Sequence, residues 1–288
     1  MSLDQQIDQL INPLARGLSD IIFYQINIFG QGFPLIVLWL VSAAVFFTCY
    51  LGFINIRGFS KAISIVSGKN GKSSGPGEIS HFQALSTAIS GTVGVGNIGG
   101  VAVAISIGGP GAAFWLFMAG FLGMSTKFVE CTLGVKYRRH NPDGSVSGGP
   151  MYYLERYLLD RGFPQLGKLL GGFYALALVI GCFGIGNMFQ SNQAYVQVLG
   201  ITGGENSFFA DKGWLFGLLL GGAVAAVIIG GIRSIASVAS KIVPFMAVLY
   251  VFSAVLIIAM SSEHVVGAII LIISSAFETS SMTGGAIG

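Results

Sequence analysis

The sequence predicts an all-α polytopic membrane protein, because its composition is strongly apolar and its apolar runs are long. Hydrophobic residues make up 53% of the 288 residues, charged residues make up only 9%, and the mean hydropathy is +0.77. A soluble domain carries roughly 25% charged residues. A soluble fold of the present composition would lack the polar surface to cover its core, so lipid is the expected solvent. The 43 glycines agree, because small residues let membrane helices approach one another closely.

Seven apolar runs reach about 20 residues, the length that a helix needs to cross a bilayer. They cover residues 33–53, 81–107, 112–134, 169–199, 214–232, 242–260 and 265–288. Glycines interrupt the second run, the fourth is long enough to tilt or to extend past the lipid, and the chain stops inside the seventh. Residues 1–32 form an amphipathic amino-terminal segment, of which residues 1–25 are expected to lie as a helix on the membrane surface.

Basic residues gather in alternate loops, and this pattern orients the chain. Most of the 15 Lys and Arg residues follow the first span, lie between the third and fourth, or lie between the fifth and sixth. The positive-inside rule assigns these loops to the cytoplasm and places the amino terminus outside. Residues 150–159 mix Tyr and Leu with charges and are expected to form an interfacial helix on the cytoplasmic face. The basic residues concerned are Arg57, Lys61, Lys69, Lys72, Lys136, Arg138, Arg139, Arg156, Arg161, Lys168, Arg233 and Lys241.

The second span contains a glycine-rich stretch at its centre, SGTVGVGNIGG over residues 90–100. Gly94, Gly96 and Gly99 match the G-x-G-x-x-G dinucleotide pattern by letter. That pattern needs a preceding strand, a βαβ unit and an acidic residue about 20 positions later, and the sequence predicts none of these. Close helix packing explains the glycines better, but it leaves the polar residues among them unexplained.

Those polar residues are Ser90, Thr92 and Asn97, and they lie at the middle of the membrane. Lipid cannot satisfy their hydrogen-bonding groups, so they must face protein, water or a ligand. A broken helix accounts for both features, because an unwound turn between two half-helices directs a negative dipole end and a positive one into the same gap. The gap then suits a cation and a carboxylate. We predict Ser90, Thr92 and Asn97 as Na⁺ ligands, and Thr92, Gly96 and Asn97 as contacts of a bound solute.

The seventh span carries a second candidate break, in the sequence FETSSMTGGAIG over residues 277–288. Ser, Thr and paired glycines again interrupt an apolar segment, and Thr283 and Gly284 are further candidates for contact with a solute. The second and seventh spans run in opposite directions, as corresponding elements of an inverted repeat must. Glu278 is an intramembrane carboxylate, for which pairing with another helix, cation binding and protonation all stay open.

Two other groups of side chains have a structural and a functional interpretation. Asn187, Gln190 and Gln193 share one face of the fourth span, where they either form hydrogen bonds between helices or contact a bound solute. Phe114 and Trp115 follow an external turn, and we expect them only to anchor the outer membrane interface.

Four motifs together resemble the alanine or glycine:cation symporter family of sodium-coupled amino-acid carriers. They are SGTVGVGNI at 90–98, GGPGAAFW at 108–115, GGPMYY at 148–153 and GNMFQSNQA at 186–194. The resemblance implies a leucine-transporter-type inverted-repeat fold with discontinuous helices. The chain would then be an amino-terminal fragment, truncated after about seven spans. Its parts would be an extra first helix with a cytoplasmic linker at 33–80, a first inverted repeat at 81–263 and the start of a second at 264–288.

The function implied by the resemblance is sodium-coupled symport of a small neutral amino acid, alanine or glycine, by alternating access. Na⁺ would be the coupling ion and Gln190 the preferred contact of the amino acid in the fourth span. The protein would be a monomer in the inner membrane of a prokaryote. No enzymatic step, organic cofactor or nucleic-acid partner is implied. The alternatives are a passive channel, a proton-coupled amino-acid transporter on the same scaffold, a membrane-bound dehydrogenase using residues 94–99 and a purely structural membrane subunit.

Overall fold

The computed structural model is mostly helical, and its chain divides into two compact units. The first unit comprises Met1–Phe59, Ile98–Phe128 and Met260–Gly288, and the second comprises Ser60–Asn97 and Val129–Ala259. The residues that the structure describes are 13, 16–17, 20–28, 31–69, 79–182, 187–210 and 212–287.

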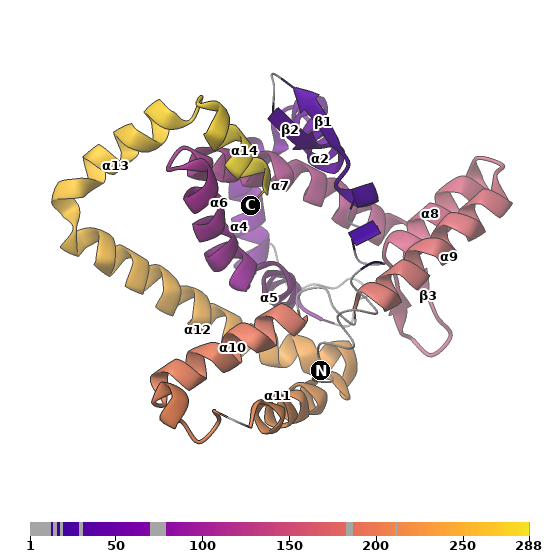
Figure 1. Ribbon diagram of the computed structural model, residues 1–288. Helices are drawn as coiled ribbons and strands as arrows, with labels where there is room; N and C mark the ends of the chain where they lie inside the picture. The colour runs from indigo at the N-terminus through magenta and orange to yellow at the C-terminus, as the bar shows by residue number, and fades with distance from the viewer. Residues whose placement is uncertain are drawn as a thin grey trace. The chain divides into compact units, whose positions relative to one another are not determined.

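The elements of each unit are labelled in Figure 1. Those of the first unit are β1 (Gln25–Ile28), β2 (Gln31–Pro34), α2 (Leu35–Tyr50), α3 (Ile54–Arg57), α6 (Val101–Gly108), most of α7 (Ala112–Lys136), α13 (Ser262–Ser275) and α14 (Thr279–Ile287). Those of the second are most of α4 (Phe59–Val66), α5 (His81–Thr92), β3 (Arg139–His140), β4 (Val146–Ser147), α8 (Pro150–Asp160), α9 (Pro164–Gly181), α10 (Asn187–Ile201), the 3-10 helix η2 (Gly204–Asn206), α11 (Gly213–Ile228) and nearly all of α12 (Gly231–Met260). The π-helical turn η1 (Gly96–Gly100) contains the boundary between the units.

The predicted class of helical membrane protein is confirmed. Among the described residues, three helices are long and apolar enough to cross a membrane, namely α7, α9 and α12. The count rises to five if each bent pair is one span: α5 with η1 and α6, and α13 with α14. Helices α2 and α11 are apolar but have only 16 residues each. The predicted division into seven spans is therefore matched in part.

The loop predicted between the fifth and sixth spans is wrong, because α12 already begins at Gly231 and runs for 30 residues. Arg233 and Lys241 consequently lie within this helix and not between two spans. Its buried residues are Ala236, Ala239 and Val243, which have the spacing of one helix face. Two cations and three serines lower the hydropathy of residues 231–241, so the apolar pattern predicts a start of the helix that is too late.

The long fourth run also differs from its prediction, because two helices cover it instead of one. Helix α9 ends at Gly181 and α10 begins at Asn187. Residues 183–186 are not among the residues that the structure describes. Pro164 occupies the first turn of α9, where a missing backbone N–H costs nothing. The helix therefore starts before the apolar run at 169 does.

Helices α8 and α9 pack together as a helical hairpin (Figure 1). Gly167 and Gly171 of α9 are buried and lie one turn apart. A Cβ atom would lie 2.8 Å from the carbonyl oxygen of Glu155 at the first position, and 2.8 Å from that of Met151 at the second. Glycine at both positions therefore lets the two backbones approach, as small residues four apart do between membrane helices. The helix predicted over 150–159 is confirmed as α8.

The amino-terminal segment contains a short antiparallel hairpin that was not predicted. Strands β1 and β2 pair from Gln25 with Pro34 to Ile28 with Gln31. The surface helix predicted over residues 1–25 shares only Gln25 with this hairpin, which forms because QINI alternates polar and apolar side chains with the period of a strand. The rest of that segment lies largely outside the described residues.

Helix α2 is fixed against α7 by buried polar side chains. The hydroxyl oxygens of Thr48 and Ser125 are hydrogen-bonded at 2.9 Å, and the Ser125 hydroxyl lies 3.1 Å from the carbonyl oxygen of Ala44. The following helix α3 is fixed to α7 as well, because Asn55 Nδ2 donates to the carbonyl oxygen of Phe121 at 3.2 Å. Each such bond between membrane helices contributes about 0.6 kcal/mol on average. The extra first helix is therefore a packed part of the first unit.

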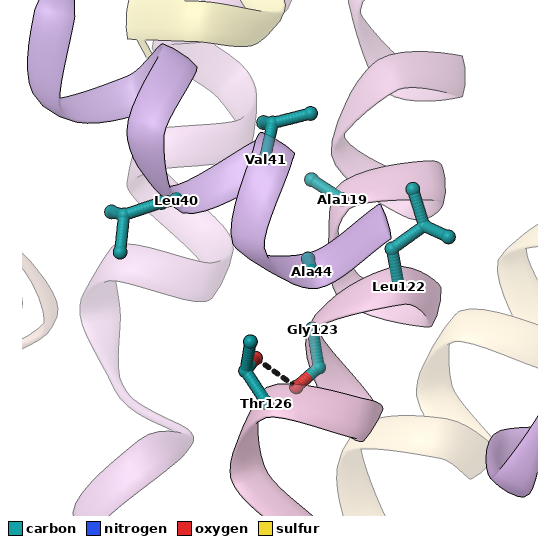
Figure 2. A pocket seen from close by; sticks show the side chains of 7 residues that line it. All are labelled: Leu40, Val41, Ala44, Ala119, Leu122, Gly123 and Thr126. Carbon is teal, nitrogen blue, oxygen red and sulfur yellow. Dashed lines mark hydrogen bonds between the residues drawn. The ribbon is translucent and has the colours of Figure 1, made fainter. Parts of the chain in front are cut away.

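A cavity of about 170 Å³ lies between the same two helices. Figure 2 shows its lining, which is apolar except for Thr126, whose hydroxyl donates to the carbonyl oxygen of Gly123 at 2.7 Å. The lining residues are Leu40, Val41, Ala44, Ala119, Leu122, Gly123 and Thr126. The wall of this cavity has room for a further methyl group at one position, Gly123.

Gly123→Ala is expected to stabilise the protein, because a Cβ atom at this position meets no atom within 4 Å. Replacing Gly by Ala inside a helix contributes about 0.5–1 kcal/mol, and a methyl group on the cavity wall adds about 0.8 kcal/mol. Gly120→Ala is the matched control, since position 120 is equally open but does not line the cavity. Thermal unfolding in detergent should give the larger increase in Tm for Gly123→Ala; equal increases would show that the cavity contributes nothing.

Candidate functional site

The second apolar run is broken where the sequence predicts a break. Helix α5 ends at Thr92, Val93 is extended with φ −93° and ψ 117°, and the π-helical turn begins at Gly96. Two hydrogen bonds close the unwound turn. The N–H of Asn97 donates to the carbonyl oxygen of Gly94 at 3.1 Å, and the N–H of Gly94 donates to Asn97 Oδ1 at 3.0 Å. The break is thus a specific turn with its own hydrogen bonds.

Asn97 has a structural role in this turn that the sequence analysis missed. Its side-chain oxygen is engaged by the Gly94 N–H, which occupies one of the two lone pairs that a cation could use. The amide nitrogen of the same side chain remains available to donate to a carboxylate. The signal was present in the sequence, because a short Asn side chain can accept from backbone N–H groups a few residues away.

Thr92 is the last residue of α5, and its side chain is exposed. Its hydroxyl donates to the carbonyl oxygen of Ala88 at 2.7 Å. Since the only hydroxyl proton is used in this bond, the lone pairs of Oγ1 are left for a cation. Ser90 and Gly96 are exposed as well, and a Cβ atom at position 96 would meet no atom within 4 Å.

Gln190 of α10 lies against the same turn. A Cβ atom at Gly94 would be 2.8 Å from Gln190 Nε2 and 3.3 Å from its amide carbon. The structure therefore brings together a polar side chain of the fourth run and the break of the second. Asn187 is used differently, because it donates to the carbonyl oxygen of Cys182 and accepts from the N–H of Met188, both at 2.8 Å.

The seventh run is also broken, with an angle of 95° between α13 and α14. Helix α13 ends at Ser275 and α14 begins at Thr279. The hydroxyl of Thr283 donates to the carbonyl oxygen of Thr279 at 2.9 Å, so its lone pairs are free in the same way as those of Thr92. The side chain of Glu278 is exposed at this bend.

Trp115 supports the second break, which the sequence analysis did not foresee. Its indole N–H donates to the carbonyl oxygen of Ala276 at 2.6 Å. Ala276 follows the end of α13, where a carbonyl group lacks a helical partner. The Trp115 ring also packs edge-on against Phe277, with centroids 6.2 Å apart. The expectation that Trp115 only anchors the membrane interface is therefore wrong.

Helices α6 and α14 pack with their backbones in close contact (Figure 1). A Cβ atom at Gly108 would lie 2.6 Å from the Cα of Gly284, and one at Gly284 would lie 2.5 Å from the Cα of Gly108. The buried hydroxyl of Ser281 donates to the carbonyl oxygen of Gly108 at 2.7 Å. Gly284, a predicted solute contact, is therefore buried against α6, and its contact with a solute stays a prediction.

The predicted site residues fall into two groups, one in each unit. Ser90, Thr92, Gly96, Asn97 and Gln190 belong to the second unit, and Thr283 and Gly284 belong to the first. Each group lies at or beside a broken helix. Each also contains a threonine whose hydroxyl proton is held by its own helix.

A helical membrane protein with two interrupted spans, each carrying polar residues at its break, has the features of a secondary transporter. The model of the sodium:alanine symporter family matches residues 17–288. The chain belongs to this family, which is a family of transporters and not of enzymes. The resemblance found in the sequence motifs is thereby confirmed.

Individual relatives carry related names. The chain is 41% identical over 263 residues to the sodium/alanine symporter AgcS of Methanococcus maripaludis, which covers 91% of this chain and 56% of the relative. It is 39% identical over 242 residues to the putative sodium/proton-dependent alanine carrier protein YrbD of Bacillus subtilis, a match that covers 84% of this chain and 46% of the relative. It is 34% identical over 254 residues to the probable sodium/glutamine symporter GlnT of Bacillus subtilis, a match that covers 88% of this chain and 50% of the relative. The chain thus spans about half the length of the curated relatives it matches.

Proposed function

We propose that the protein is a secondary active transporter that couples the symport of a small neutral amino acid, alanine or glycine, to Na⁺ by alternating access. The observation that carries this proposal is the unwound turn at Gly94–Asn97 with Gln190 against it. An unwound turn inside an apolar span is costly unless it lines a cavity or binds something. Family membership supports an amino acid and Na⁺ as the species bound.

The proposed fold is the leucine-transporter-type inverted repeat. Residues 1–32 would be the amino-terminal segment and 33–80 the extra helix with its cytoplasmic linker. Residues 81–263 would form the first repeat, and 264–288 would begin the second. The two breaks support this division, because corresponding broken helices are the expected sites of inverted-repeat transporters. We further propose that the protein acts as a monomer in the inner membrane of a prokaryote, with its amino terminus outside.

In this proposal each predicted residue has a role. The hydroxyl of Thr92 donates its proton within α5, so the lone pairs of its Oγ1 are offered to Na⁺, while Thr283 contacts the amino acid. Asn97 holds the turn and donates its amide N–H to the carboxylate, while Gln190 contacts the polar groups of the amino acid. The exposed backbone at Gly96 lies closest to the solute, because a side chain is absent there. Ser90 and Gly284 complete the predicted ion and solute contacts, respectively.

Uptake into vesicles tests the function in the protein of full natural length. Labelled alanine, glycine and glutamine should be compared with an inward Na⁺ gradient, with an inward proton gradient, and with neither. We expect saturable uptake of alanine or glycine that requires the Na⁺ gradient. Uptake driven only by the proton gradient would favour the proton-coupled alternative, to which the name of the Bacillus subtilis relative YrbD gives some support. Uptake that neither saturates nor depends on any gradient would indicate a channel.

Thr92→Val tests the ion role within the same assay. Valine keeps the shape of threonine but removes the oxygen, so the Na⁺ concentration for half-maximal uptake should rise about tenfold, as for one lost bond to a charged group. Thr92→Ser should retain most of the affinity. Thr87→Val is the matched control, because Thr87 makes the same bond to the residue four positions before it, on the same helix, at 2.8 Å. An equal effect of Thr92→Val and Thr87→Val would show that Thr92 is not a ligand of Na⁺.

A further inference from the structure

A group of cations and tyrosines lies where α7 ends and α8 passes beside it. The ammonium of Lys136, the last residue of α7, lies 5.3 Å from the ring centroid of Tyr137. The guanidinium of Arg161 lies 5.3 Å from the ring centroid of Tyr157. The two tyrosine rings are in edge-on contact, with centroids 6.4 Å apart. These contacts connect two cations through two rings in edge-on contact.

Two further arginines join the same group. Arg156 Nη1 of α8 donates to the carbonyl oxygen of Arg138 at 3.4 Å, which ties the two segments together a second time. The contacts thus group the cationic side chains of Lys136, Arg156 and Arg161 at the end of a candidate membrane span, and Arg138 belongs to the same segment as Tyr137. The basic cluster, as it is called below, consists of Lys136, Tyr137, Arg138, Arg156, Tyr157 and Arg161.

The charge of the basic cluster is not neutralised by the carboxylates that the structure describes. No described carboxylate lies within 4.0 Å of any of its four cations, although Glu155 and Asp160 are on α8 itself. Asp143 of the preceding loop is occupied by a local partner, Ser145. The hydroxyl and the backbone N–H of Ser145 donate to Asp143 Oδ1 at 2.6 and 2.9 Å. Those bonds hold the pKa of Asp143 below its usual value. The cluster therefore presents a net positive surface.

Apolar side chains are exposed beside these cations. Leu159, Phe163 and Leu166, which lie at the turn between α8 and α9, are 55%, 60% and 44% exposed. Tyr157 of the cluster is itself 43% exposed. Exposed apolar and aromatic residues next to Lys and Arg are typical of helices at a membrane interface, where the rings lie at the depth of the headgroups.

We propose that the basic cluster binds the headgroup of an anionic phospholipid. Guanidinium groups bind phosphate through directed hydrogen bonds, and the uncompensated cations of the cluster complement the negative charge of such a headgroup. The cluster should lie at the depth of the lipid headgroups, because it directly follows α7, a helix that is long enough to cross the bilayer. The exposed apolar residues then contact the upper part of the acyl chains. The site does not depend on the transport function proposed above.

Binding of short-chain phosphatidylglycerol to the detergent-purified protein, titrated by native mass spectrometry, tests this site. Wild-type protein should bind phosphatidylglycerol and should not bind phosphatidylcholine. Arg156→Gln with Arg161→Gln should weaken phosphatidylglycerol binding roughly thirtyfold, and each single substitution about fivefold. Arg156→Lys with Arg161→Lys keeps the charge and should retain most of the binding.

Lys61→Gln with Lys69→Gln is the matched control, because it removes two exposed charges of the second unit outside the cluster. Equal losses in both double variants would overturn the proposal in favour of general charge attraction. Equal binding of phosphatidylcholine would also overturn it, as would complete displacement of the lipid by millimolar inorganic phosphate, which would indicate a small-anion site. If the double Gln variant fails to fold, as judged by size-exclusion chromatography, the single substitutions decide between the same outcomes.

Discussion

Gly108→Ala is expected to destabilise the first unit strongly. The new Cβ atom would lie 2.6 Å from the Cα of Gly284 and 2.8 Å from the carbonyl oxygen of Ser280. Backbone atoms cannot rotate away, so α14 would have to move off α6 and lose the hydrogen bond from Ser281 to Gly108. Overpacking and the lost bond together cost about 2–4 kcal/mol. The measurement is the Tm of the detergent-purified protein, together with the yield of folded protein.

Two further variants make this result specific. Gly284→Ala introduces a Cβ atom into the same contact from the side of α14 and should lower the Tm to a similar extent. The decrease in Tm of the double variant should be smaller than the sum of the two single decreases. Gly267→Ala on α13 is the control, since a Cβ atom there meets no atom within 4 Å. A Tm for Gly108→Ala that equals the Tm of the control would contradict the close approach of α6 and α14.

Gly94→Ala is expected to weaken amino-acid binding while leaving the fold intact. The new Cβ atom would lie 2.8 Å from Gln190 Nε2, the end of a flexible side chain that can move aside at little cost. Moving it removes the proposed contact with the amino acid. A lost hydrogen bond to a charged group corresponds to roughly a 10- to 100-fold increase in KM for uptake. The Tm should change by no more than a few degrees.

A double-mutant cycle separates this effect from a general disturbance of the break. Gln190→Ala should raise KM to a similar extent, and Gly94→Ala should add nothing in the Gln190→Ala background. Gly91→Ala in the last turn of α5 is the control, because a Cβ atom at position 91 meets no atom within 4 Å. Additive effects of the two substitutions would show that Gly94 acts by another route than Gln190.

The sequence predicted the two broken spans because their signal is local. Glycines and small polar residues inside an apolar run are visible without knowledge of neighbouring helices, and α5 does end at Thr92 within the stretch that was singled out. The second break lies at the start of the predicted stretch, between Ser275 and Thr279. The bend therefore comes before the paired glycines and not at them. Those glycines, of which Gly284 packs against Gly108, serve close packing instead.

Other parts of the site depend on partners that are distant in the sequence. The bond of Trp115 to Ala276 joins residues 161 positions apart, and no periodicity within either helix indicates it. The pairing of Thr48 with Ser125 is of the same kind, with a separation of 77 residues. Gln190 was singled out by a family resemblance, and its position against Gly94 is visible only in three dimensions. Local patterns therefore identified the breaks, but not the side chains that hold them.

The distance along the chain between α6 and α14 has a consequence for biogenesis. Ser281 and Gly108 are separated by 173 residues. At a synthesis rate of about 5–20 residues per second, Ser281 leaves the ribosome roughly 9–35 s after Gly108. During that interval α6 stands in the nascent protein without the helix that covers its glycine face. The two helices of the α8–α9 hairpin are close in sequence, so the whole hairpin is synthesised long before Ser281. Of the two units that the structure describes, the one that contains residues 20–59 is therefore completed after the other.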